Sequence, residues 1–140
     1  MQNPLDLWPA FNLDAIRTPA SILSEQASLI ASKTHNLLKA EVRTRPVPAS
    51  DNNGSGQFHV ELLLIAPKLG DFTYRVCWTE HGLQPYPIKL VANQQEVIAQ
   101  NEAEFLDWLG KTLGAAEVRQ AVQLMYAQSE LTPSTRWKQG

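Results

Sequence analysis

Two stretches of alternating apolar and polar residues constrain the fold of this chain more than any other feature. Alternation with a period of two is typical of strands that bury one face. The PKLG segment between the two stretches contains proline and glycine, which are typical turn residues, so the pattern predicts an antiparallel hairpin. The apolar positions are Phe58, Val60, Leu62 and Leu64 in the first stretch and Phe72, Tyr74, Val76 and Trp78 in the second.

One register of this hairpin gives favourable side-chain pairs on both faces of the sheet. With Leu62 opposite Tyr74, the apolar residues of both strands share a face, and Glu61 lies opposite Arg75 on the other face. A slip by one residue would move every side chain to the wrong face, so we expect the register with these pairs.

The stretch CWTEHGLQPYPIKL, residues 77 to 90, gathers a cysteine, a glutamate, a histidine and two large aromatic residues. Its pattern predicts a second hairpin in which Trp78 pairs with Tyr86. His81, Gly82 and Leu83 then form a three-residue loop, with Gly82 supplying any positive φ. We therefore interpret this stretch as a turn between strands and His81 as a solvated turn residue.

The remaining segments predict helices around this sheet. Thr18 and Pro19 are an N-cap and first residue for a helix that we expect to run to Leu38. A short alternating strand over residues 39–47 follows, and the loop ASDNNGSG ends it. The segment QEVIAQ is ambiguous between strand and helix, and its alternation favours a fifth strand.

Asn101, with Glu104 three residues later, forms the start of a helix that Gly114 closes. A last helix is expected over residues 115–128. The buried positions of the two helices are predicted to be Phe105, Leu106, Leu109 and Leu113, followed by Val118, Ala121, Val122 and Met125.

These elements predict an α+β fold. It consists of an N-terminal helix, a four- or five-stranded antiparallel meander and two C-terminal helices packed on the sheet face of Phe58, Tyr74 and Ile88. Residues 1–130 form a single domain in this interpretation, with residues 1–17 as an irregular arm and 131–140 as a polar tail. A chain of 140 residues with 44% hydrophobic content is large enough to bury a core without disulfides.

Charge and cysteine content narrow the function classes. A net charge of −2 and a pI near 5.9 provide no overall basic field for nucleic acid. The one cysteine, Cys77, cannot form an intramolecular disulfide, which favours a cytoplasmic location. The N-terminus lacks the pattern of a signal peptide, and the longest apolar run, residues 62–66, is far too short for a membrane span. We expect no membrane association.

Catalytic and metal sites have little support in the sequence. Cys77 and His81 are about 13 Å apart along an extended strand, too far for a nucleophile and its base. His59 can approach Cys77 from the neighbouring strand, but no orienting group or oxyanion-stabilising motif accompanies the pair. We therefore predict no catalytic residue, while an enzyme that uses His59 and Cys77 stays an alternative.

Cofactors and metals are not expected either. The three histidines, His35, His59 and His81, lack the spacing of a zinc site. The glycine-rich piece NNGSGQ precedes a strand, so it lacks the helix N-terminus that a phosphate cradle uses.

The outer face of the sheet offers the main functional hypothesis. Leu63, Ile65 and Val91 are predicted to lie there as an apolar strip that binds a protein partner or a second copy, with Trp8 and Phe11 of the arm contributing. Alternatively, the arm covers this strip within one chain. We predict a non-catalytic protein-interaction module, such as an adaptor, a chaperone-like protein or a neutralising partner, that forms a homodimer or a heterocomplex. A further alternative is single-stranded nucleic-acid binding by the basic strand that carries Lys39, Arg43 and Arg45.

Overall fold

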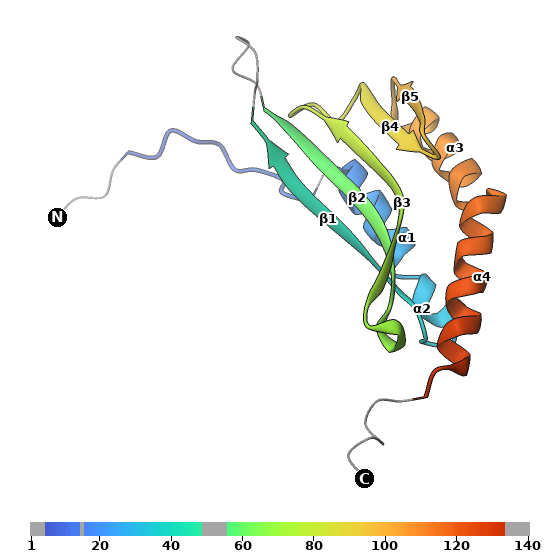
Figure 1. Ribbon diagram of the computed structural model, residues 1–140. Helices are drawn as coiled ribbons and strands as arrows, with labels where there is room; N and C mark the ends of the chain where they lie inside the picture. The colour runs from blue at the N-terminus through green and yellow to red at the C-terminus, as the bar shows by residue number, and fades with distance from the viewer. Residues whose placement is uncertain (1–4, 15, 49–55, 134–140) are drawn as a thin grey trace.

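The computed structural model describes residues 5–14, 16–48 and 56–133 and shows one antiparallel sheet with helices on one face (Figure 1). The strands follow one another in the order β1-β2-β3-β4-β5, which makes the sheet a five-stranded meander. The predicted α+β class and element order are confirmed. The elements are α1 (Pro19–Ala27), α2 (Ile30–Lys33), β1 (Lys39–Val47), β2 (Gln57–Ala66), the 3-10 turn η1 (Pro67–Leu69), β3 (Phe72–His81), β4 (Ile88–Ala92), β5 (Gln95–Ala99), α3 (Glu102–Leu113) and α4 (Ala116–Leu131).

The core lies between the helices and the even-numbered side chains of β2. Val60, Leu62 and Leu64 point into it, and Ile22, Phe105 and Met125 reach it from three different helices. Ile88 is fully buried and Tyr74 packs against this core, as expected for the helix-covered face. Phe58 lies at its margin, partly exposed, with its ring 5.7 Å from that of His81.

The register predicted for the first hairpin is wrong by two residues near the turn and by three beyond a bulge. Tyr74 pairs with Leu64, and the pairing shifts between Leu62 and Leu63, so that Leu62 lies opposite Cys77. This bulge places both Val76 and Cys77 in the core and turns Trp78 to the outer face, because one extra residue reverses the alternation. Regular alternation in the sequence of β3 gives no sign of it.

The second hairpin also differs from its prediction. Trp78 pairs with Val91 rather than with Tyr86, and β3 continues to His81, where the predicted loop begins. The connection therefore spans residues 82–87 and contains a cis bond between Tyr86 and Pro87. His81 is half-buried, and its Nδ1 lies 2.7 Å from the carbonyl oxygen of Gly82.

The N-terminal helix is shorter than predicted. Thr18 caps α1 and Pro19 is its first residue, as expected, but α1 ends at Ala27 and only the single turn of α2 follows. His35 and Asn36 adopt positive φ values of 50° and 63°, which a helix does not allow. They turn the chain so that Leu38 enters the core just before β1.

The C-terminal half follows its predictions closely. β5 forms the expected fifth strand, and Asn101 caps α3 by accepting a hydrogen bond from the amide of Glu104. α4 extends three residues past the predicted end at 128, to Leu131. Among the described residues, no helix is both long and apolar enough to cross a membrane.

Candidate functional site

The outer sheet face does not carry the exposed apolar strip that the sequence suggested. Leu63 and Ile65 do point away from the helix-side core, but only 4% and 3% of their surfaces are exposed. Their neighbours on β1 are Glu41 and Lys39, whose long side chains flank them. The expectation of a solvent-accessible strip is therefore wrong, and Val91 is half-buried as well.

The N-terminal arm does not cover this face either. Trp8 is 76% exposed and Phe11 61% exposed, and the arm extends away from the sheet and helices (Figure 1). The apolar residues predicted to form one interface are thus separated: those of the sheet are buried, whereas those of the arm face solvent.

The outer face instead carries a polar cluster centred on Trp78. The ring of His59 stacks on it with centroids 5.0 Å apart, and Nζ of Lys89 lies 5.3 Å from the Trp78 centroid. His59 Nδ1 is 3.2 Å from a carboxylate oxygen of Glu80, and Arg75 donates a 3.1 Å hydrogen bond to Glu61. The predicted contact of Glu61 with Arg75 thus exists, although as a diagonal and not a direct pair.

Electrostatics stabilise the ionised carboxylates of this cluster. Burial alone raises the pKa of Glu61, but the hydrogen bond from Arg75 and the charges of His59 and Arg75 outweigh it and leave that pKa below its ordinary value. Burial likewise acts to raise the pKa of Glu80, and interactions with His59 and Lys89 lower it overall. The two carboxylates are thus paired with basic side chains of the same cluster.

Cys77 and His59 are not brought together. Cys77 lies in the helix-side core opposite Leu62, while His59 pairs with Glu80 and lies on the outer face. Burial raises the pKa of the Cys77 thiol to about 12, so the thiol is protonated at neutral pH. Among the described residues, no group of three or more histidine, cysteine, aspartate or glutamate side chains is placed to hold a metal ion.

Glu41 partly neutralises the positive charge of β1, the basic strand. Glu41 forms ion pairs with Lys39 at 3.6 Å and with Arg43 at 3.2 Å, and Arg45 follows on the same face. Trp78, which the alternation pattern placed on the same face as Tyr74, lies on that outer face with His59 instead. Its surface is occupied by His59 and two cationic side chains, which limits base stacking.

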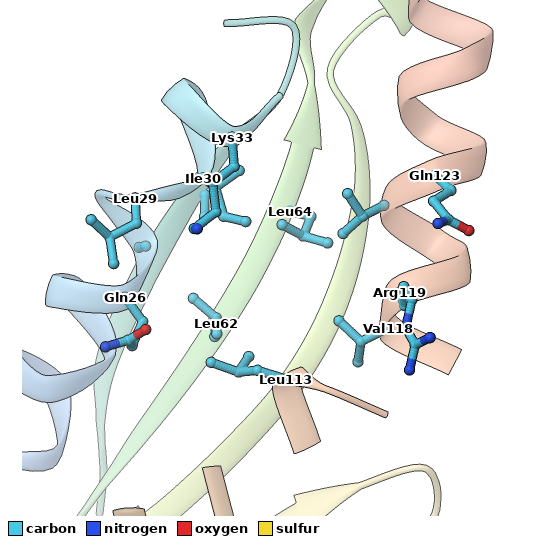
Figure 2. A pocket seen from close by; sticks show the side chains of 13 residues that line it. Gln26, Leu29, Ile30, Lys33, Leu62, Leu64, Leu113, Val118, Arg119 and Gln123 are labelled. Atoms are coloured by element: carbon cyan, nitrogen blue, oxygen red, sulfur yellow. The ribbon is translucent and has the colours of Figure 1, made fainter. Parts of the chain in front are cut away.

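A mostly apolar hollow lies on the opposite, helix-covered face. α1 and α2 cover β1, α4 covers part of β2, and a groove of about 430 Å³ separates them (Figure 2). Leu62 and Leu64 form its floor together with Ala40 of β1. We call this feature the helix groove.

Two helical walls line the helix groove. One wall consists of Gln26, Leu29, Ile30 and Lys33, and the other of Val118, Arg119, Val122 and Gln123 of α4, with Leu113 of α3 at one end. The first four are spaced i, i+3, i+4 and i+7. They share one face because Ser28 and Leu29 keep right-handed helical backbone angles between α1 and α2. Leu29 is 46% exposed, so an apolar side chain at the rim is open to solvent.

The rim of the helix groove is basic. Lys33 contributes one charge on the α1–α2 wall, and Arg119 contributes another from α4, nearer to Leu113 (Figure 2). In the described part of the chain, neither side chain forms an ion pair with a carboxylate, and Arg119 donates a hydrogen bond to the carbonyl of Gly114. An apolar floor between cations suits an apolar segment with acidic flanks.

The sequence held part of the signal for this site. Val118 and Val122 belong to the buried positions predicted for the last helix, and Ala27 and Ile30 lie within the segment predicted to form the first helix. Periodicity predicts that each helix meets the sheet, but it does not predict whether the two helices also meet each other. Comparisons with protein-family models, curated proteins and solved structures find no match for this chain.

Proposed function

We propose that this protein is a non-catalytic protein-interaction module that binds an extended apolar segment in the helix groove. The observation that carries the proposal is the groove itself, whose floor and walls are mostly apolar and which lies open between α1–α2 and α4. A soluble domain gains stability by closing such a surface, so a groove that stays open suits a partner. A cytoplasmic location belongs to the same proposal, since Cys77 has no intramolecular disulfide partner.

The groove dimensions favour a short segment. From Gln26 to Lys33 the wall rises about 10 Å, at about 1.5 Å per helical residue. A polyproline-type extended chain advances about 3.1 Å per residue and places side chains three residues apart on one side, so three or four residues of a partner span the groove. Two apolar side chains on one side of such a segment fill the floor, and acidic residues beyond them reach Lys33 and Arg119.

Peptide binding tests the proposal. The probe is a fluorescein-labelled ten-residue peptide with two aromatic residues three positions apart and an aspartate on each side. Its control has serine in place of both aromatic residues. We expect fluorescence anisotropy to show saturable binding of the aromatic peptide, and at least tenfold weaker binding of the serine control.

Two substitutions on α4 locate the binding. Val122→Lys puts a charge into the groove and is expected to weaken binding at least tenfold. The lysine blocks the floor, and a bound apolar segment would strip water from its charge. Gln120→Lys adds the same charge at an exposed position of the same helix outside the groove, and should leave affinity within about twofold. Equal losses in both variants would contradict the proposal.

A further inference from the structure

The N-terminal arm is an unpartnered apolar segment of the same chain. Its described residues contact neither the sheet core nor the groove, and they run away from the body (Figure 1). The large apolar side chains that it leaves exposed are Leu5, Leu7, Trp8, Phe11, Leu13 and Ile16. Six such residues in one short segment are a cost to solubility unless they are covered.

The centre of the arm has the form that the helix groove requires. Trp8 and Phe11 are three residues apart, and their ring centroids are 6.0 Å from each other, so they present one joint apolar surface. Side chains three residues apart share a side in a polyproline-type extended chain, which Pro9 favours. Four residues, Trp8 to Phe11, also match the length of the groove wall.

The arm's backbone suits an apolar site as well. The amide of Trp8 already donates to Oδ1 of Asp6 at 3.0 Å, and Pro9 has no amide hydrogen. Trp8 and Pro9 thus need no hydrogen-bond acceptor from the groove, whose lining is mostly apolar. Asp6 and Asp14 flank the aromatic pair with negative charge, opposite in sign to Lys33 and Arg119 at the rim.

The direction of the arm indicates whose groove it enters. Arg17, at its base, is held by ion pairs to Glu25 at 2.8 Å and Glu102 at 3.3 Å, and Thr18 is extended as the N-cap of α1. The chain therefore leaves α1 pointing outward, whereas the groove lies along the other end of α1. Entry into its own groove would require a reversal at this held base.

We propose that the arm of each chain binds in the helix groove of a second copy, which makes a symmetric arm-exchanged homodimer. This inference rests on the proposed function of the groove and names its occupant. Two-fold symmetry gives two identical arm–groove contacts. Trp8 and Phe11, with about 150–250 Å² of surface each, make the total buried area on the order of 1,000 Å², near the lower end for specific interfaces.

Sedimentation equilibrium of the full chain is the experiment. At about 100 μM we expect twice the 15.6 kDa chain mass. Trp8→Ser combined with Phe11→Ser should give the single-chain mass with an unchanged circular dichroism spectrum, since both side chains are exposed. The control Leu83→Ser removes an even more exposed apolar side chain from the β3–β4 connection and should leave the dimer intact.

Mixing separates exchange between copies from other modes of assembly. Two groove variants, Val122→Lys and the more exposed Arg119→Glu, should each be monomeric alone. Mixed with the Trp8→Ser/Phe11→Ser protein, either one offers an intact arm to an intact groove, and a mixed dimer of lower affinity should form. A monomeric unsubstituted protein, an arm variant that stays dimeric, or mixtures that stay monomeric would overturn the inference.

The arm variant also distinguishes the two proposals. Its groove has lost the occupant that we infer, so it should bind the aromatic peptide probe at least as tightly as the unsubstituted protein does. If the unsubstituted protein is monomeric while this variant binds the probe, arm exchange fails and the groove function stands. If the variant does not bind the probe, the groove function itself fails.

Discussion

At the scale of single residues, burial decides the chemistry of Cys77. The thiol lies in the core on the face opposite to His59, and the lack of solvent raises its pKa to about 12. The sequence placed Cys77 on a strand correctly, but its facing depends on the bulge at Val76, which the alternation pattern conceals. The reactivity of Cys77 therefore depends on which side of the sheet it faces, and its residue type and strand alone do not predict that side.

Thiol reagents test this placement of Cys77. We expect native protein to react with a disulfide reagent such as dithionitrobenzoate at least a hundredfold more slowly than unfolded protein at pH 8, because the buried thiol is both protonated and covered. The release of the yellow thiolate measures the rate. Rapid reaction of native protein, slowed by His59→Ala, would instead support the enzyme alternative.

The carboxylates around Trp78 give the protein an acid-sensitive contribution to stability. The folded pKa of Glu61 is lowered, so its contribution is fully present above its ordinary pKa of 4.5 and is lost as pH falls through the folded value. Glu61→Gln should cost about 1 kcal/mol of unfolding free energy at pH 7. Urea unfolding should show this difference shrinking as pH falls below about 4.5, and a difference that is constant down to pH 3 would contradict the assignment.

At the scale of elements, the sequence predicted well wherever a local cap or a single amphipathic stripe determines the structure. Thr18, Asn101 and the alternation of β5 fall into this group. The failures lie where a tertiary choice competes with a local pattern. The apolar residues Leu37 and Leu38 continue a helical spacing, yet the left-handed turn at His35 and Asn36 delivers Leu38 to the core from outside any helix.

The stripe of α3 provides a test at this scale. Phe105 is fully buried and packs near Trp108 and Tyr86, whereas its neighbour Leu106, also predicted to be buried, is 39% exposed. Phe105→Ala should destabilise the fold by about 3–5 kcal/mol, and Leu106→Ala by about 1 kcal/mol or less. Thermal or urea unfolding measures both, and similar losses would mean that α3 is rotated relative to the sheet.

At the scale of the whole molecule, the sheet's two faces differ in burial from what the sequence suggested. Leu63 and Ile65 are buried beneath their neighbours, so a charge at Ile65 should unfold the protein and not merely dissociate it. The helix groove, in contrast, depends on two segments more than 80 residues apart, about Gln26 to Lys33 and Val118 to Gln123. A local sequence pattern does not predict whether two such distant segments touch or leave a groove between them. The candidate site could therefore be found only from the fold.

We propose that a partner binds in the helix groove and not on the outer sheet face. Amide chemical shifts of the ¹⁵N-labelled Trp8→Ser/Phe11→Ser variant, followed while the aromatic peptide probe is added, test it most directly. We expect the shifts to cluster at Leu29, Ile30, Lys33 and Val122. Shifts that cluster at His59, Trp78 and Lys89, or a spectrum that does not change, would contradict it.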